Sequence, residues 1–378
     1  MAQAFTNCRI LREGAFLEDS AIIVDGDMIT DVVPVTLLAR DLPRHDLAGA
    51  ILAPGLIDIQ VNGGGGILFN DTSSVEGIRA IGAAHARTGT TGFLPTLISA
   101  DQATMARALE AVDAAIEAGV PGVLGIHVEG PFLNRARKGI HKESELRQLD
   151  EEALSLLTKP RRGCVLVTLA PEVASSDDIR ALADAGVLVC AGHTDADYAT
   201  VVRGLEAGIR GFTHLFNAMS QLTGRNPGAV GAALDDKNSW CGIIADGHHV
   251  HPASLRIALA AKGLEKLILV TDAMPSVGAT QKSFRLQGRD IAVTDGVCRS
   301  ADGTLAGSDL DMISAVRGSM TMMDLSLPQA TLMASRNAAE FLRLSDRTGA
   351  IAPGRRADFI VLSAQHQVLE TWIGGQRQ

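Results

Sequence analysis

The chain has 378 residues, of which 46% are hydrophobic, and its formal net charge is -9 at pH 7. This length suits a barrel of roughly 250 residues with additional structure, and the acidic balance argues against nucleic-acid binding, which needs a basic face. No apolar run approaches the roughly 18 residues needed to span a membrane, and the opening MAQAFTNCRI lacks a signal-peptide pattern. The five cysteines form no Cys-x-x-Cys pair, so we expect buried, reduced thiols in a cytoplasmic protein.

The two ends of the chain share a β-rich pattern. Residues 1–50 contain short strand-like runs separated by Gly and Asp, as in AIIVDGDMITDV, and residues 345–378 are similar. We predict that these ends pair into a small β-sandwich domain. Residues 51–344 would then form a separate catalytic domain.

Between residues 51 and 273, short apolar runs alternate with helical stretches. We count eight runs, namely LIDIQVN, TGFLPTLIS, GVLGIHVEG, VLVTLAPE, VLVCAGHT, GFTHLFN, CGIIADG and LILVTDA. Continuous apolar runs are typical of parallel strands that are covered on both faces. The pattern predicts an α/β fold with a (β/α)8 TIM-like barrel, and a doubly wound open sheet is the alternative.

Helical patterns fall between these runs. The clearest follows Ser99, where Met105, Leu109 and Val112 form an apolar stripe, and Ser99 and Gln102 have the spacing of a capping box. Weaker helical patterns cover residues 73–88, 144–158, 176–185, 195–207 and 252–262. Residues 276–305 read as a hairpin insert after the eighth strand.

Polar side chains stand at the ends of the strand-like runs. In order they are Gln60, Asn62, Thr96, Glu129, Glu172, His193, His214, His248, His249 and Asp272. Barrel active sites form at the C-terminal ends of the strands, so we expect these residues to meet on one rim. Glu129, His193 and His214 supply the carboxylate and two imidazoles of a catalytic zinc site with an open position for water. Asp272 is a candidate general base, and its alternative role is to cap the next helix.

Several motifs resemble the amidohydrolase superfamily, and within it the N-acetylglucosamine-6-phosphate deacetylases. They cover nearly the whole chain, in the family's order: APGLIDIQVNG, GIHVEGPFLN, LAPE, AGHT, THLFNAM, CGIIADGHHV, VTDAM, GTLAGS and GAIAPGRRADFIVL. The resemblance implies metal-dependent hydrolysis of N-acetyl-D-glucosamine 6-phosphate to D-glucosamine 6-phosphate and acetate, in amino-sugar catabolism or cell-wall recycling. The alternatives are the same reaction on N-acetylgalactosamine 6-phosphate and a non-catalytic scaffold protein of the same fold.

The first strand departs from the usual superfamily pattern. Most amidohydrolases carry His-x-His there, whereas this chain has Gln60-x-Asn62, and amides are poor zinc ligands beside imidazole. By this resemblance we predict one divalent metal per subunit on Glu129, His193 and His214. Zn²⁺ is the first choice, and Fe²⁺ or Co²⁺ are possible. The two amides would fill the vacant second-metal position by hydrogen bonding.

The resemblance also implies roles for the remaining residues. His141 would help to polarise the acetyl carbonyl, and Arg225 would bind the substrate phosphate in the neighbouring subunit's site, which implies a homodimer. The implied substrate-binding positions are Ile140, His141, Asn217, Ala218, Arg225, Asp246, Gly247, His248, His249, Ala306, Gly307 and Ser308. Ile140 is a departure, because a small polar residue is more usual before the histidine.

Overall fold

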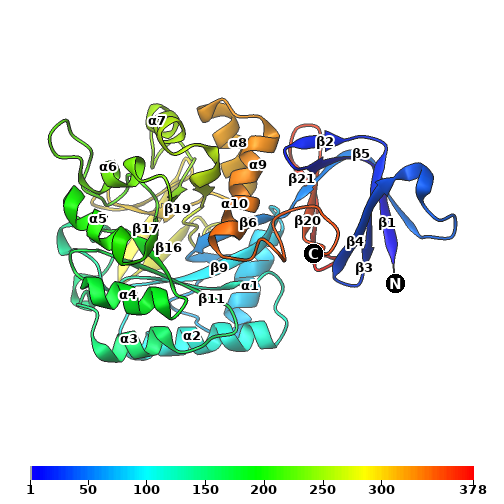
Figure 1. The fold of residues 1–378 in the computed structure, drawn as a ribbon. Coiled ribbons are helices and arrows are strands. Elements are labelled where there is room, and N and C mark those ends of the chain that lie inside the picture. Colours follow the sequence, from blue (N-terminus) through cyan, green and yellow to red (C-terminus); the bar gives the residue numbers. More distant parts are fainter. Residues whose placement is uncertain (1) are drawn as a thin grey trace.

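The barrel and a smaller sheet domain lie side by side in a computed structural model that describes residues 2–378 (Figure 1). The eight barrel strands neighbour one another in sequence order. They are β6 (Leu56–Val61), β9 (Thr90–Ile98), β10 (Gly125–Glu129), β11 (Cys164–Leu169), β12 (Leu188–Ala191), β13 (Ile209–Phe212), β14 (Trp240–Ile243) and β15 (Leu267–Leu269). All neighbouring strands are parallel, and a bridge between Val61 and Ala273 joins the two edges. The predicted (β/α)8 barrel is confirmed.

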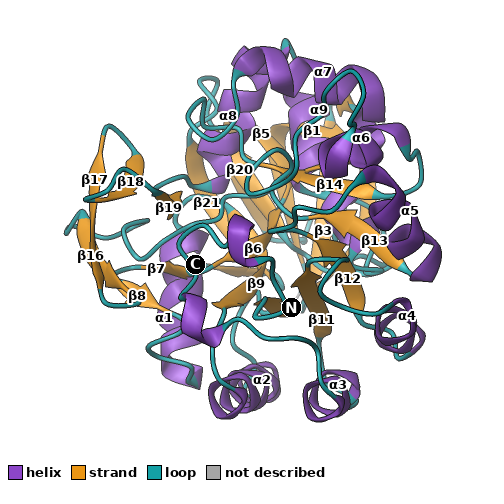
Figure 2. Ribbon diagram, turned by 90° about the vertical axis from the view of Figure 1, so that its left-hand side faces the viewer, coloured by secondary structure: helices purple, strands orange, loops and turns teal. Residues whose placement is uncertain are grey.

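Helices surround the barrel strands on the outside (Figure 2). They are α1 (Val75–Ala86), α2 (Gln102–Glu117), α3 (Glu151–Thr158), α4 (Ser176–Asp184), α5 (Tyr198–Ala207), α6 (Gly228–Asp235) and α7 (Pro252–Lys262). Because helices cover one face of the sheet and the barrel interior covers the other, every residue of β6, β9 and β10 is buried. Burial on both faces explains the continuous apolar runs.

Several predicted helix starts were wrong, including that of α5, which begins at Tyr198 and not at residue 195. Two others show the reason. Helix α2 is capped by Asp101, whose side chain accepts a hydrogen bond from the Thr104 amide, and not by a box of Ser99 and Gln102. Helix α3 begins at Glu151 rather than at residue 144, because Asp150 accepts from the Ala153 amide. In both cases an aspartate next to the first turn satisfies the free amides of the helix end.

The chain leaves the barrel after β15 and forms an antiparallel four-stranded insert. Its strands are β16 (Ser283–Leu286), β17 (Arg289–Thr294), β18 (Val297–Ser300) and β19 (Leu305–Ser308). The predicted hairpin is therefore present and is extended by β19, whose last residue, Ser308, bridges to Ala273. Three helices that the sequence reading missed follow, α8 (Met312–Met323), α9 (Leu327–Ala334) and α10 (Arg336–Phe341), and all three contact β6.

The smaller domain joins the two ends of the chain. Its strands are β1 (Gln3–Arg12), β2 (Ala15–Leu17), β3 (Ser20–Asp25), β4 (Met28–Pro34), β5 (Arg44–Pro54), β20 (Phe359–Leu362), β21 (Val368–Ile373) and β22 (Gln376–Arg377). Antiparallel pairing of β5 with β20 makes them one continuous sheet. The rings of Phe5, Phe359 and Trp372 form a separate core, with Phe5 edge-on to the other two at 4.9 and 4.8 Å.

None of the helices within residues 2–378 is long and apolar enough to cross a membrane.

Candidate active site

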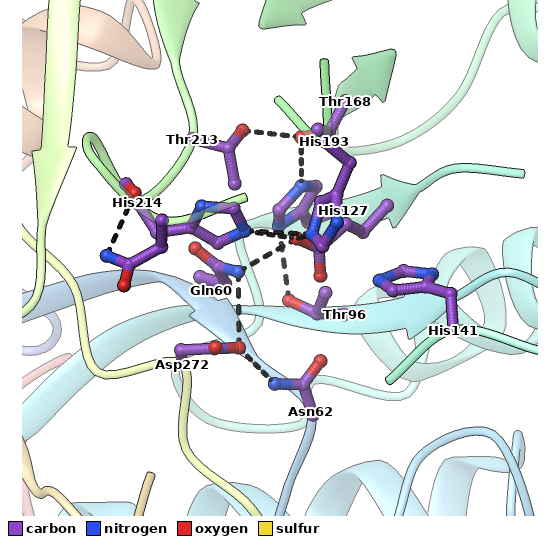
Figure 3. A network of polar contacts seen from close by, with 12 residues as sticks. Gln60, Asn62, Thr96, His127, His141, Thr168, His193, Thr213, His214 and Asp272 are labelled. Atoms are coloured by element: carbon purple, nitrogen blue, oxygen red, sulfur yellow. Dashed lines mark hydrogen bonds and ion pairs between the residues drawn. The ribbon is translucent and has the colours of Figure 1, made fainter. Parts of the chain in front are cut away.

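A carboxylate and two imidazoles, from Glu129, His193 and His214, converge where their strands end. Figure 3 shows the rings of His193 and His214 beside Asp272. Glu129 is the last residue of β10, while His193 and His214 follow β12 and β13. The Oε1 atom of Glu129 lies 3.2 Å from His193 Nε2 and 3.0 Å from His214 Nε2, and the two nitrogens are 3.0 Å apart. All three side chains are buried, so the three ligand atoms face one point that is shielded from bulk water.

The protonation of this cluster suits a cation. His193 Nδ1 donates to the Arg137 carbonyl at 2.8 Å, so Nε2 is the ring nitrogen that is available to a metal. Burial alone would raise the pKa of Glu129, but the two imidazoles outweigh it and hold that pKa well below its usual value. An ionised carboxylate and two imidazole nitrogens are the donor set of zinc enzymes, so the three residues could hold one divalent metal.

Beside this cluster, two side-chain amides at the end of β6 point their N–H groups at carboxylates. Gln60 Nε2 donates to Glu129 Oε1 and to Asp272 Oδ1, both at 3.2 Å. Asn62 Nδ2, just beyond the strand, donates to Asp272 Oδ1 at 2.6 Å. Both amides therefore present hydrogens and not lone pairs, and hydrogen bonds fill the position where a His-x-His pair would offer two imidazoles.

Asp272 stands just beyond β15, with a backbone φ of 53°. Burial, and then the negative charge of Glu129, raise the pKa of Asp272 to about 6. The next helix within the described residues is α8, which is capped by Asp311, so the alternative of a helix cap does not apply to Asp272. A carboxyl with a pKa near neutrality can accept a proton and return it within one reaction.

His141 faces the same space from the loop after β10. Its Nδ1 accepts hydrogen bonds from the Ser99 hydroxyl at 2.7 Å and from the Ser99 amide at 3.3 Å. The amide can only donate, so the remaining proton of a neutral ring lies on Nε2. Burial, followed by repulsion from His193, lowers the pKa of His141 to about 3. The ring is therefore neutral near pH 7 and offers an Nε2–H donor.

The cavity over these groups has a volume of about 350 Å³. The predicted site residues that line it are Asn62, Glu129, Ile140, His141, His193, His214, Asn217, Ala218, His249, Asp272 and Gly307. Gln60 lies behind them in hydrogen bonds to both carboxylates. Asp246 stands behind His249, whose Nδ1 lies 2.6 Å from its carboxylate. The predicted residues thus gather largely around one cavity.

Other predicted residues lie outside that cavity. Ala306 and Ser308 are buried in β19, where the Ser308 hydroxyl donates to the Thr271 carbonyl at 2.5 Å. His248 lines a different surface hollow with the β16–β18 insert, and Gly247 forms the turn before it. Arg225 is exposed on the loop before α6 and does not reach the cavity of its own chain.

The sequence reading missed several cavity-lining residues. These are Ile98, Ala136, Arg137, Gly139, Ile244, Met274, Thr304 and Leu305. Thr304 and Leu305 stand in the motif GTLAGS and Ile244 in CGIIADG, so the motifs carried a signal for them. For Arg137 the sequence contains no such signal, because the residue resembles any solvated charge.

A polar layer beneath the cluster was also missed. His127, two residues before Glu129, lies 3.3 Å from the Thr96 hydroxyl and 2.7 Å from the Thr168 hydroxyl (Figure 3). Thr168 continues the chain to Thr213 at 2.6 Å. Burial lowers the pKa of His127 to about 4, so its ring is neutral near pH 7. This layer satisfies polar groups within the barrel and supports the strands that carry the cluster.

Known proteins match the chain along its whole length. A model of the amidohydrolase family matches residues 51–377, and a model of the NagA composite domain matches residues 3–52. The chain belongs to the amidohydrolase family. This amidohydrolase is 43% identical to the N-acetylgalactosamine-6-phosphate deacetylase of Shewanella sp. (strain ANA-3), over 97% of this chain and 94% of the relative.

Other relatives carry the name of the gluco epimer. The N-acetylglucosamine-6-phosphate deacetylase of Haemophilus influenzae is 32% identical, over 100% of this chain and 99% of the relative. The crystal structure of N-acetylglucosamine-6-phosphate deacetylase from Pasteurella multocida superposes with a TM-score of 0.97 at 33% identity, and covers 100% of both chains. This amidohydrolase therefore shares both barrel and smaller domain with those deacetylases.

Proposed function

We propose that this amidohydrolase removes the acetyl group of N-acetyl-D-glucosamine 6-phosphate and releases acetate and D-glucosamine 6-phosphate. The observation that carries the proposal is the arrangement of three metal-ligand atoms, the carboxyl of Asp272 and the Nε2–H donor of His141 around one cavity. The names of the relatives supply the substrate class.

The side chains divide the reaction between them. A divalent metal on Glu129, His193 and His214 would supply a water of lowered pKa and would polarise the acetyl carbonyl. Asp272 takes a proton from the water as the water oxygen bonds to the acetyl carbon. The Nε2–H of His141 donates to the carbonyl oxygen as negative charge develops there. The C–N bond then breaks, and Asp272 passes the proton to the departing amine.

The proposal includes the metal, the assembly and the location. Zn²⁺ fits two imidazoles and a carboxylate best, and Fe²⁺ or Co²⁺ use the same donors. A homodimer, in which Arg225 binds the substrate phosphate in the neighbouring site, is supported by the exposure of Arg225 outside its own cavity. A cytoplasmic location accords with the five cysteines, all of which are free.

A second candidate substrate is N-acetylgalactosamine 6-phosphate. The observation that favours it is the 43% identity to a deacetylase of that name, against 32% and 37% for two of the relatives named for the gluco sugar. The acetamido group that reacts is the same in both epimers, so the metal cluster, Asp272 and His141 would act on either. The epimers differ in the orientation of one hydroxyl group, whose contacts decide the preference.

Acetate release by the zinc-loaded protein tests the proposal. N-acetylglucosamine 6-phosphate, its galacto epimer and unphosphorylated N-acetylglucosamine would be compared by kcat/KM, with bound metal measured on the same samples. We expect one metal per chain, rapid release from the phosphorylated gluco sugar, and little from the sugar without phosphate. A higher kcat/KM for the galacto epimer would show that N-acetylgalactosamine 6-phosphate is the preferred substrate and would leave the mechanism unchanged. No acetate release from either phosphorylated sugar would overturn the proposed reaction.

A further inference from the structure

Glu172, the last residue of the LAPE motif, takes no part in the reaction described above. It follows β11, yet its carboxylate contacts segments that follow two other strands. Oε1 accepts hydrogen bonds from Asn134 Nδ2 at 2.8 Å and from the Asp195 amide at 2.7 Å, and Oε2 accepts from the Thr194 hydroxyl at 2.5 Å. A side chain that accepts three hydrogen bonds from two segments joins them.

Both of these segments belong to the active site. The first is the loop of residues 134–141, which ends at His141, and the second is the turn of residues 193–195, which begins with His193. They also contact each other directly. The Asn134 amide donates to the His193 carbonyl at 3.0 Å, and Arg137 Nε donates to Asp195 Oδ1 at 2.8 Å. We call these contacts, together with the three at Glu172, the rim clasp.

The loop held by the rim clasp also contacts the imidazole ring of His193. The carbonyl of Arg137, within the loop, accepts the hydrogen bond from His193 Nδ1 that leaves Nε2 free for a metal. His193 has a backbone φ of 48°, in the left-handed region, which residues other than glycine adopt only when surrounding contacts hold them there. Three hydrogen bonds to the carboxylate of Glu172 hold the loop and the two residues that follow His193.

We propose that Glu172 is a positioning residue that orients His193 for the metal and, through the same loop, His141 for the acetyl carbonyl. This inference rests on the proposed metal-dependent function. The alternative is that Glu172 only stabilises the surface, as many exposed carboxylates do. The two roles differ in outcome, because only a positioning residue changes metal affinity when it is removed.

The test compares Glu172→Ala and Glu172→Gln with the wild-type chain. Zinc affinity would be measured by competition with a chromogenic chelator, kcat and KM would be measured at saturating zinc, and thermal unfolding would be followed on the same samples. For Glu172→Ala we expect zinc to bind about tenfold more weakly or worse, the usual effect of losing support behind a metal ligand. We also expect a lower kcat at saturating zinc with a smaller change in KM, because His141 is also released.

Glu172→Gln should recover most of the loss. The amide oxygen can accept from Asn134 and from the Asp195 amide, and the amide nitrogen can donate to the Thr194 hydroxyl. Asn134→Asp is a milder change that keeps Glu172 and replaces its hydrogen-bond donor by a second carboxylate, which repels it. It should weaken zinc binding in the same direction as Glu172→Ala, and it keeps the test available if the alanine variant does not fold.

Asp46→Ala is the matched control. In the smaller domain, Asp46 accepts from the same kinds of donor, Asn7 Nδ2 at 2.7 Å and the Ala48 amide at 2.8 Å. Its loss should lower the unfolding temperature without changing zinc affinity. If Glu172→Ala, or Asn134→Asp in its place, bound zinc as tightly as the wild type, the positioning role would be overturned. A wild-type chain that bound no zinc would instead overturn the proposed function and this inference with it.

Discussion

The two halves of the barrel rim carry similar polar residues with opposite consequences. On the half formed by β10, β12 and β13, a carboxylate oxygen and two imidazole nitrogens face one position, where each can offer a lone pair. On the half formed by β6, Gln60 and Asn62 point N–H groups at Glu129 and Asp272. Lone pairs attract a cation, whereas N–H groups hold carboxylates in place without one. We therefore expect the number of bound metals to depend on which of these atoms are hydrogen-bond donors and which are acceptors, and not on polarity alone.

Asp272 lies between the two halves, and its replacement should have the largest effect. Asp272→Asn keeps the shape of the side chain and removes its ability to accept a proton. We expect kcat to fall by about 10²–10⁴-fold, the usual contribution of a general acid–base group. Zinc content should stay at one per chain, because the three residues of the metal cluster are unchanged. Retention of most of the activity would mean that another group moves the proton.

The half of the rim formed by β10, β12 and β13 can be tested at His141, which follows β10. His141→Phe removes the Nε2–H and keeps a planar ring, so kcat should fall by about 10²–10³-fold, as for the loss of one oxyanion donor. Ser99→Ala is the control, because His141 keeps the hydrogen bond from the Ser99 amide and its tautomer. The serine variant should therefore lose much less activity. Equal losses in kcat would show that ring orientation, and not the donated hydrogen, is what matters.

The pH dependence of kcat/KM tests the ionisation of Asp272, the carboxyl to which both amides donate. As the proposed general base, Asp272 must be ionised, so kcat/KM should fall about tenfold per pH unit on the acid side of its pKa. That pKa is raised to about 6 by burial and by Glu129. A bound dication favours the carboxylate, which places the acid limb at or below about pH 6.

Asn62→Ala should move this acid limb to higher pH. The hydrogen bond from Asn62 favours the ionised form of Asp272 and lowers its pKa, so removal of that bond makes the carboxyl protonate more readily. Measurement of kcat/KM between about pH 4.5 and 8 for both proteins checks the shift. A limb that moved to lower pH would contradict the assigned direction of the hydrogen bond.

The smallest effect on activity is expected when the two amides at β6, Gln60 and Asn62, are replaced by residues that can bind a metal. Gln60→His with Asn62→His replaces two N–H donors by two imidazoles, and metal content at excess zinc should rise from one per chain toward two. Activity should change less than in Asp272→Asn, because the original cluster remains. The double change Gln60→Ala with Asn62→Ala is the control and should bind one metal. A single metal in both double variants would show that donor chemistry on β6 does not set the stoichiometry.

Much of the fold was predictable because its pattern repeats. Each barrel strand is an apolar run that ends at a polar residue, and the barrel brings those ends together, so the sequence alone allows Glu129, His193 and His214 to be grouped. What failed depended on contacts distant in sequence. Ser99 has the spacing of a capping residue, but its partner is His141, and Asp101 caps the helix instead. The role of Arg137 lies in its backbone carbonyl, which a side-chain pattern does not reveal.

The pairing of β5 with β20 has a consequence for how the chain reaches its native state. Pro54 lies opposite Phe359 in this pair, so the whole barrel sequence separates the two strands. Contacts so distant in sequence form slowly, because a long loop must close first. During synthesis β5 therefore emerges from the ribosome with an unpaired edge, which is a site for aggregation until the final strands arrive. The smaller domain is thus the part of the molecule that we expect to depend most on chaperones in the cell.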